Sequence, residues 1–253
     1  MNYVAPAHVL APNVQALTTL RAGGVSAGRY ASLNLATHVG DAVQAVTDNR
    51  RRLHQTLNLP SEPLWLNQEH GTRVIQAEQT IGKTPAMAIT ADAAITRQSG
   101  HVLVVLTADC LPVVLAARDG SAVAIAHAGW RGLAAGVLDA AFNALAVAAA
   151  EVAAWIGPGI SAARYEVDSA VRMAFADAPG AEQAFSPSRD AEHWYCDLAL
   201  LAQARLEALG VVSVQQSGLC TYSDPDRFYS YRRDGETGRM ATLVQIEPEA
   251  GQT

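Results

Sequence analysis

The most constraining feature of this sequence is a pair of apolar runs joined by a tight turn near the middle of the chain. Val113 to Ala117 and Ala122 to Ala126 flank the segment Arg118-Asp119-Gly120-Ser121. An Asp-Gly pair between two strands is a strong signal for a two-residue hairpin loop, because a type I′ turn needs positive φ at both central residues. The pattern therefore predicts a β-hairpin in which Arg118 faces Ser121.

Counting back along this hairpin places two chemically active residues side by side. Cys110 falls opposite Gly129, and His127 falls opposite Pro112. Cys110 and His127 then share one face as diagonal neighbours. Diagonal neighbours have Cβ atoms roughly 7–8 Å apart or less, which lets long side chains meet or hold one ion between them. The register thus predicts that this thiol and this imidazole are close together.

A thiol and an imidazole so placed have three interpretations. They are a buried thiol beside a hydrogen-bonded histidine, a Cys nucleophile with a His base, or two ligands of a borderline metal such as zinc. The metal interpretation needs a third donor. Asn67-Gln68-Glu69-His70-Gly71, a polar segment after the apolar Leu64-Trp65-Leu66, offers His70. Spacing alone leaves all three interpretations open.

The rest of the chain indicates an α+β fold. We expect helices over 47–59, 133–149, 169–175 and 197–209, strands over 101–107, 153–157 and 211–216, and a second hairpin of strands 227–233 and 240–246 joined by 234–238. Hairpins outnumber strand–helix–strand units, which favours mixed or antiparallel β-sheets packed with helices. We find no repeat or long linker, so we expect a single domain over residues 1–253. The three arginines of the first helix are expected to form a solvated face.

Composition restricts the partners and the compartment. The net charge is −6 and the pI is near 5.6, so the chain lacks the basic footprint that nucleic acid or an anionic membrane needs. The N-terminal segment has no Lys or Arg before Arg21 and no apolar core typical of a secretory signal. Three widely spaced cysteines do not make a disulfide framework. We expect a monomeric cytoplasmic protein that binds small molecules.

Several segments spread along the chain form a recognisable set. They are TTLRAGGVS (18–26), SLNLATHVGD (32–41), NQEHG (67–71), TADCLPV (107–113), HAGWRG (127–132), GPGISAARYEV (157–167) and FYSYRRDGETGRM (228–240). In this order they resemble a bacterial family long named for multicopper polyphenol oxidase, or laccase-domain proteins. The members of that family are understood as zinc-dependent purine nucleoside phosphorylases with adenosine deaminase activity. The resemblance covers nearly the whole chain.

The resemblance implies a metal bound by His70, Cys110 and His127. It implies Zn²⁺, with Cu²⁺ as the alternative ion, and phosphorolysis of adenosine, inosine, guanosine and methylthioadenosine. It also implies adenosine deamination, for which a zinc ion with an open position lowers the pKa of a bound water. Glu69 departs from the family, which often has an apolar residue or Gln there, but the ligand pattern stays intact.

Phosphorolysis needs an anion pocket as well as a metal. Arg21, beside Gly23-Gly24 in a family motif, is the first candidate for catalysis and for substrate binding. Arg131, in the turn before a helix, is the second. A third basic group follows near the C-terminus, formed by Arg232, Arg233 and Arg239.

Four further residues are candidates for the same site. Asp109 is expected either to orient a metal ligand or to act in general acid–base catalysis. Asn34 is expected to hydrogen-bond a ribose, although an Asn before a turn needs no such role. Trp130 and Tyr165 are able to stack on a purine, although core packing is the commoner role for each.

Competing functions keep the same residues and change the chemistry. In one, Cys110 and His127 act as a thiolate–imidazole pair in an amide hydrolase, and the resemblance then implies a muramyl amino acid conjugate as substrate. In another, a structural zinc is closed by Cys196 or Cys220 as a fourth ligand. A copper oxidase is the least supported, because the sequence contains no His-x-His pair for a multicopper cluster.

Overall fold

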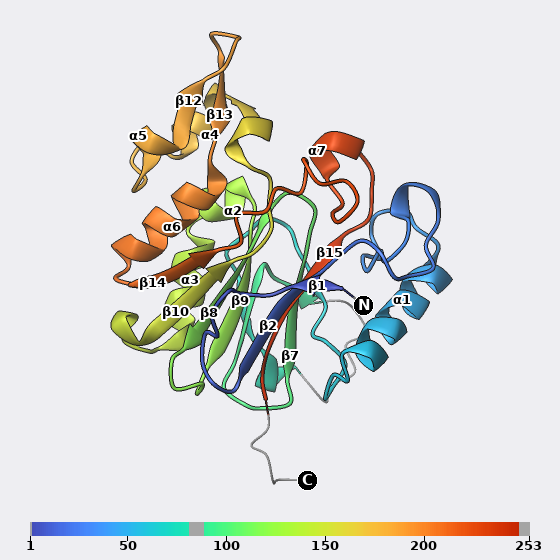
Figure 1. The fold of residues 1–253 in the computed structure, drawn as a ribbon. Helices are drawn as coiled ribbons and strands as arrows, with labels where there is room; N and C mark the ends of the chain where they lie inside the picture. Colours follow the sequence, from blue (N-terminus) through green and yellow to red (C-terminus); the bar gives the residue numbers. More distant parts are fainter. Residues whose placement is uncertain (1, 81–88, 248–253) are drawn as a thin grey trace.

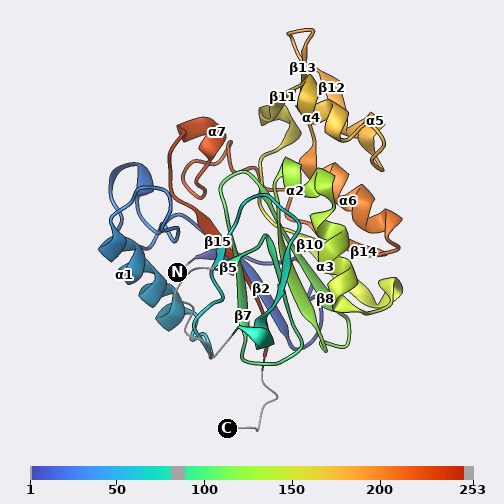
Figure 2. The same ribbon diagram turned by 180° about the vertical axis from the view of Figure 1, so that it is seen from behind.

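Two β-sheets pack face to face at the centre of the molecule, and helices cover both outer faces (Figure 1). The computed structural model describes residues 2–80 and 89–247. Helix α1 (Val43–Thr56) covers the smaller sheet, whereas α3 (Val137–Leu145) and α6 (Leu198–Ala208) cover the larger one, as the reverse view in Figure 2 also shows. This arrangement confirms the expected α+β fold with mixed and antiparallel sheets.

The larger sheet supplies the frame of the predicted hairpin. Its strands, in spatial order, are β14 (Ser213–Gln216), β10 (Val152–Ile156), β8 (Leu111–Ala117), β9 (Val123–Ala128), β6 (Ala93–Thr96) and β4 (Val74–Gln76). Strands β10 and β14 run parallel, as do β4 and β6, and the remaining pairs are antiparallel. The expected strands over 153–157 and 211–216 are therefore confirmed.

The smaller sheet brings the two ends of the chain together. Its spatial order is β1 (Tyr3–Val4), β2 (Val14–Thr19), β15 (Met240–Ile246) and β7 (Val102–Thr107). The pairing of β15 with both β2 and β7 is antiparallel. Strands β7, β8 and β9 are buried throughout, because each has one face on the other sheet and one face beneath other packed segments. Burial on both faces explains why they read as continuous apolar runs.

Shorter elements complete the fold. They are β3 (Leu66–Asn67), β5 (Ile89–Thr90), β11 (Glu166–Asp168), β12 (Phe185–Pro187), β13 (His193–Cys196), α2 (Trp130–Ala135), α4 (Ser169–Ala174), α5 (Ala181–Ala184) and α7 (Tyr231–Asp234). Strands β11, β13 and β12 form a small sheet beyond α2 and α6 (Figure 1). Within the described ranges, no helix is long and apolar enough to cross a membrane.

The hairpin between β8 and β9 has the predicted register but a different turn. Pro112 pairs with His127, as counted from the sequence. At the tip, however, Gly120 has φ of 73° whereas Asp119 is not in a positive-φ conformation, and the Gly120 amide donates to the Ala117 carbonyl. A type I′ turn is therefore wrong here. The wider loop works because Gly120 alone takes the left-handed conformation, and a Cβ there would collide with Asn13.

Two expected helices have different boundaries. Helix α1 begins at Val43, four residues before the expected start at Thr47, and Ala42 precedes it without a side-chain cap. The expected helix over 133–149 is divided into α2 and α3 by Gly136, whose φ is 95°. An alanine-rich composition does not reveal this break, because a left-handed glycine ends one helix and redirects the chain into the next.

The expected strand over 227–233 is wrong. Its C-terminal half forms α7, where the Ser230 side chain accepts a hydrogen bond from the Arg233 amide. The Arg233 guanidinium donates to the carbonyl oxygens of Thr221, Tyr222 and Phe228. These caps and long-range bonds outweigh the local strand propensity of the aromatic residues. Strand β15 consequently pairs with β2 and β7 and not with residues 227–233.

One arginine of α1 departs from the expected solvated face. The Arg50 guanidinium lies 3.7 Å from the centre of the Trp65 ring and donates two hydrogen bonds to the Leu35 carbonyl. Burial lowers the pKa of Arg50 to about 10. Arg51 and Arg52 are exposed, as expected. Arg50 therefore holds the segment around Leu35 against α1.

Candidate metal centre

The predicted meeting of Cys110 and His127 takes place at the open end of the β8–β9 hairpin. Cys110 directly precedes β8, and His127 lies in β9 opposite Pro112. His127 is 4% exposed, whereas Cys110 is half-buried. The register thus brings the thiol and the imidazole to one end of the larger sheet, as the sequence predicts.

His70 joins this pair from a separate segment that follows β3. Its Nε2 lies 3.8 Å from the Cys110 Sγ, and its ring meets the His127 ring nearly edge-on, with centroids 4.8 Å apart. One ligand atom from each of the three residues lies within 4.8 Å of the other two. His127 is buried and His70 is exposed, so the group opens to solvent on the His70 side. This geometry fits a metal with one accessible coordination position.

A glycine makes the close approach possible. A Cβ on Gly129 would lie 2.5 Å from the His70 Cδ2 and 3.0 Å from the Cys110 Sγ. Gly132 has a related role, because a Cβ there would lie 3.0 Å from the Gly71 carbonyl oxygen. The two glycines of the HAGWRG segment therefore let α2 and the His70 segment pack together around the ligand atoms.

Asp92, which directly precedes β6, contacts two of the three potential ligand residues and was not predicted from the sequence. Its Oδ1 lies 2.8 Å from the His127 Nδ1, and its carboxylate also accepts hydrogen bonds from the backbone amides of residues 69 to 71. Asp92 is fully buried. A single Asp between alanines carries no local signal of such a role. The contact requires β6 to pair with β9.

The electrostatics of the metal-free site favour a charged pair. Burial alone would raise the pKa of the Cys110 thiol, but hydrogen bonds from His127 and His70 outweigh it and lower the pKa to about 6. Burial alone would lower the pKa of His127, but Asp92 and Cys110 raise it to about 9. At neutral pH the metal-free site therefore carries a thiolate beside an imidazolium. A thiolate is the form of Cys that binds metals.

Asp109 directly precedes Cys110, but its carboxylate forms hydrogen bonds with residues outside the metal group. Its Oδ1 accepts a hydrogen bond from the Thr221 hydroxyl at 2.6 Å, and its Oδ2 accepts one from the Arg232 amide at 2.7 Å. Its φ of 91° is rare for a residue other than glycine. Asp109 thereby joins the Cys110 segment to α7, which carries Arg232.

A cavity of about 320 Å³ extends from the metal group. Its wall is apolar at Leu106, Ala108 and Ile160 and aromatic at Tyr165 and Tyr231. Its polar and basic lining residues besides the metal group and Asp109 are His38, Gln68, Thr107, Arg232 and Arg239. Two members of the basic group near the C-terminus therefore line the cavity, whereas Arg233 is used to cap carbonyl oxygens.

The other expected substrate-binding residues do not line this cavity. The Arg21 guanidinium donates to the carbonyl oxygens of Ala31 and Pro225. Asn34 is fully buried, and its amide bonds to Ala36, Asp41 and the Arg239 backbone. Arg131 is exposed and stacks on Trp130, 4.4 Å from the ring centre. Arg21 and Asn34 thus hydrogen-bond to protein groups in neighbouring segments, a difference from Arg131 that the sequence alone did not reveal.

A fourth protein ligand is absent from the group of potential ligands found in the described ranges, which holds His70, Cys110 and His127. Cys196 is fully buried in β13, where burial raises the pKa of its thiol to about 12. The Cys220 Sγ accepts hydrogen bonds from the amide and hydroxyl of Ser161. Neither cysteine joins the metal group.

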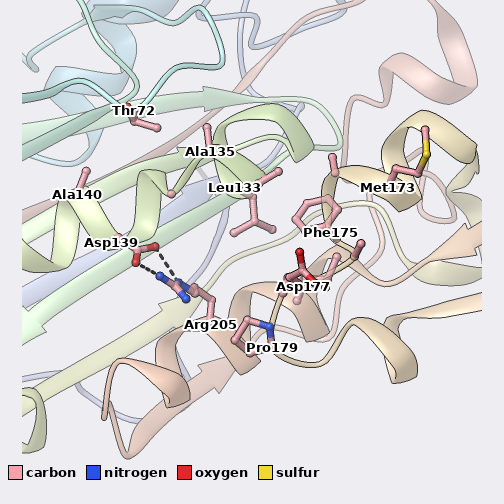
Figure 3. Close-up of a pocket in the computed structure, with 16 residues that line it drawn as sticks. Thr72, Leu133, Ala135, Asp139, Ala140, Met173, Phe175, Asp177, Pro179 and Arg205 are labelled. Atoms are coloured by element: carbon pink, nitrogen blue, oxygen red, sulfur yellow. Dashed lines mark hydrogen bonds and ion pairs between the residues drawn. The ribbon is translucent and has the colours of Figure 1, made fainter.

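A second cavity, of about 600 Å³, is lined by residues of α2, α3 and α6 and by the segment from Met173 to Pro179 (Figure 3). Leu133 and Phe175 form part of its apolar lining, and Asp139 pairs with Arg205 at one end. It is larger than the cavity at the metal group but contains none of the three ligand residues. Size alone therefore does not identify the site of chemistry.

Comparisons with known proteins find relatives, one of them with a solved structure, that match nearly the whole length of this chain. The purine nucleoside phosphorylase PA4543 of Pseudomonas aeruginosa is 46% identical over 92% of this chain and 94% of its own length. The purine nucleoside phosphorylase YfiH of Escherichia coli K12 is 41% identical over 92% and 94%. The crystal structure of Neisseria meningitidis protein NMB0706 has a TM-score of 0.91 at 43% identity and covers 98% of this chain and 100% of its own.

The comparison with protein families covers nearly the same span. The profile of one family matches residues 15–247, which include the larger sheet, the smaller sheet from Gln15 onward and all three potential metal ligands. The description of that family names copper and phenol oxidation, whereas the related proteins above are named for nucleoside phosphorolysis. The chain belongs to the family described as multi-copper polyphenol oxidoreductase laccase.

Proposed function

We propose that this protein is a zinc-dependent purine nucleoside phosphorylase that also deaminates adenosine. The observation that carries the proposal is the His70–Cys110–His127 group at one end of a cavity that also holds two arginines. The names of relatives at 41% and 46% identity support the phosphorylase activity. We further propose adenosine, inosine, guanosine and methylthioadenosine as substrates.

The donor set fits a zinc ion. One thiolate and two imidazoles suit zinc, and they also suit copper. The absence of a side chain at Gly129 leaves room for the ligand atoms, and the exposed side of the group at His70 leaves one coordination position for substrate or water. Bound there, zinc would act as a Lewis acid on a water molecule or a substrate atom. We favour zinc over copper because both proposed reactions need a Lewis acid and neither needs a change of oxidation state.

The basic residues of the cavity are suited to hold phosphate. The Arg239 guanidinium is half-buried and donates through one nitrogen to the carbonyl oxygens of Thr237 and Gly238. Arg232 donates to the Glu166 carbonyl oxygen and lies over the Tyr165 ring. Neither guanidinium forms an ion pair with a carboxylate among the described residues. Arginines that lack a carboxylate partner in a cavity favour an anionic ligand.

The apolar and aromatic residues that line the cavity are suited to a purine. Leu106, Ile160 and the aromatic ring of Tyr165 offer apolar contacts to a base. The Thr107 hydroxyl is buried, lines the cavity and has no hydrogen-bond partner among the described residues, so it is available to a ligand. Phosphorolysis would form a bond between a phosphate oxygen and the ribose C1′ while the bond from C1′ to the purine nitrogen breaks. The departing purine nitrogen takes up a proton.

Deamination uses the same cavity in a different way. A water oxygen would bond to C6 of adenosine, the C6–nitrogen bond would break, and ammonia would leave with the added proton. His38 lines the cavity, and burial together with Arg239 lowers the pKa of its imidazole. His38 is therefore neutral at pH 7 and able to accept or donate a hydrogen bond there.

The activity test uses the zinc-loaded protein with phosphate and either inosine or adenosine. The expected products are hypoxanthine and ribose 1-phosphate from inosine, and inosine together with adenine from adenosine. Cys110→Ser should abolish both reactions and lower the zinc content measured by elemental analysis. Stoichiometric zinc without any purine product would disprove the proposed function while leaving the metal site intact.

One observation favours a second function, that of a thiol amide hydrolase. Asp92, His127 and Cys110 form a carboxylate–imidazole–thiolate series, and the pKa of the thiol is lowered to about 6. Such a series activates a cysteine nucleophile. Cleavage of a muramyl amino acid amide by the metal-free protein, blocked by thiol alkylation, would establish it. Loss of all activity on chelation, with full recovery on adding zinc, would exclude it.

The monomeric state, the cytoplasmic location and the single-domain organisation expected from the sequence all stay predictions.

A further inference from the structure

A single buried carboxylate connects two of the three potential metal ligands. We propose that Asp92 is a positioning residue that preassembles the metal site by fixing the His127 ring and the His70 backbone together. This inference rests on the metal site of the proposed function. It concerns a residue that contacts neither the substrate cavity nor the metal, because Asp92 is fully buried and reaches the ligands through hydrogen bonds.

The contact with His127 selects which ring nitrogen faces the ion. The Asp92 Oδ1 lies 2.8 Å from the His127 Nδ1, and the exposures of both side chains are 5% or less. A carboxylate accepts hydrogen bonds only, so the Nδ1 must carry the proton. The Nε2 is then the nitrogen left for the metal, and the ring cannot rotate without losing a buried hydrogen bond.

The contact with the His70 segment fixes an unfavourable backbone conformation. The Asp92 carboxylate accepts hydrogen bonds from the amides of Glu69, His70 and Gly71 at 3.2, 2.9 and 2.7 Å. His70 has φ of 63°, a left-handed conformation that few residues other than glycine adopt. Three successive amides that converge on one carboxylate hold the segment in this conformation. The His70 ring consequently stays near the Cys110 Sγ.

Charge balance points to the same role. Among the described residues, no Lys or Arg forms an ion pair with Asp92, and its carboxylate pairs with His127. An imidazole that binds a metal through Nε2 is neutral, so in the metal-loaded site the buried Asp92 carboxylate would have the metal as its nearest positive charge. With one negative charge on Asp92 and one on the Cys110 thiolate, a divalent ion brings the site to neutrality.

The experiment compares zinc affinities of the full-length wild type, Asp92→Asn and Asp139→Asn by competition with a chromogenic chelator. His127 and the His70 amide donate to the Asp92 Oδ1, whereas the Glu69 and Gly71 amides donate to Oδ2. An Asn side chain has one acceptor oxygen and one donor nitrogen, so it cannot serve both sets of donors. We expect Asp92→Asn to bind zinc about 10–100-fold more weakly. Asp139→Asn removes the ion pair to Arg205 away from the metal group and should bind zinc within about twofold of the wild type.

Spectroscopy separates positioning from a general loss of stability. With Co²⁺ in place of zinc, Asp92→Asn should change the thiolate charge-transfer band, whereas Asp139→Asn should not. Should Asp92→Asn not fold, Asp92→Glu keeps the charge, displaces the carboxylate by one methylene and is expected to weaken zinc binding too. The wild type carries an independent test. Nitrogen NMR of the zinc-loaded protein should find the His127 Nδ1 protonated.

Two results would overturn the inference. One is a folded Asp92→Asn that binds zinc within about twofold of the wild type. The other is a zinc-loaded wild type whose His127 binds the metal through Nδ1. Both results are independent of purine turnover. The inference therefore survives if zinc binds as expected and no nucleoside is cleaved, and it fails alone if the enzyme is active but indifferent to Asp92.

Discussion

Gly129 lies so close to His70 that a Cβ at position 129 would come within 2.5 Å of the His70 Cδ2. The same Cβ would lie 3.0 Å from the Cys110 Sγ. No side chain larger than hydrogen fits between these two potential ligands unless one of them moves. The glycine of the HAGWRG segment is therefore part of the metal site although it offers no ligand atom.

The first prediction concerns this glycine. Gly129→Ala should displace His70 or Cys110 and lower zinc affinity by about tenfold or more, since overpacking costs about 1–3 kcal/mol. The measurement is chelator competition on the purified variant. Gly218→Ala is the control, because a Cβ at Gly218 meets no atom within 4 Å and only strains the backbone there. Equal zinc affinities for Gly129→Ala and the wild type would contradict the claim that a Cβ at position 129 displaces a metal ligand.

The second prediction concerns phosphate. Arg239→Met should raise the KM for phosphate about tenfold or more while leaving zinc content unchanged, because a hydrogen bond to a charged group contributes about 1.5–3 kcal/mol. The measurement is initial-rate kinetics of inosine phosphorolysis over a range of phosphate concentrations. Arg51→Met, an exposed site on α1 beside Asp48, should leave the KM unchanged. An unchanged KM in Arg239→Met would place the phosphate elsewhere.

The third prediction distinguishes support from substrate contact. Arg21→Met should lower the free energy of unfolding by about 1–3 kcal/mol, because the carbonyl oxygens of Ala31 and Pro225 lose their guanidinium donor. Urea unfolding measures this loss, and exposed Arg52→Met should change stability by less than about 0.5 kcal/mol. The KM for phosphate should stay the same in Arg21→Met. A tenfold rise would restore Arg21 as an anion ligand.

The fourth prediction concerns the thiol of the metal-free protein. The pKa of Cys110 is lowered to about 6, so the rate of its alkylation by iodoacetamide should reach half its maximum near that pH and approach the maximum at neutral pH. Peptide mass spectrometry distinguishes Cys110 from Cys220, whose pKa is also lowered, and from the buried Cys196. Zinc should protect Cys110 alone. A pH midpoint of alkylation near the ordinary pKa of a thiol would contradict the charged pair of Cys110 and His127.

Much of the central hairpin could be predicted because it depends on neighbours in the chain. The pairing of Pro112 with His127 follows from two apolar runs and one glycine-containing turn. The strand predicted over 227–233 failed because its hydrogen bonds run to Asp109 and to carbonyl oxygens in the segment from 221 to 228. Local strand propensity contains no information about hydrogen-bond partners that are far away in the sequence.

The sequence by itself determined the two strands of the hairpin, the shared side of Cys110 and His127, and the resemblance that added His70. The alternation of side chains along paired strands is a local property, so a correctly predicted register also predicts which side chains share a face. Only the tertiary structure decided that Asp92 joins His70 to His127, that Arg239 and Arg232 line the cavity, and that Arg21 and Asn34 hydrogen-bond to protein groups outside it. These roles depend on hydrogen bonds between distant segments, and a side chain's neighbours are fixed only when the sheets and loops have packed.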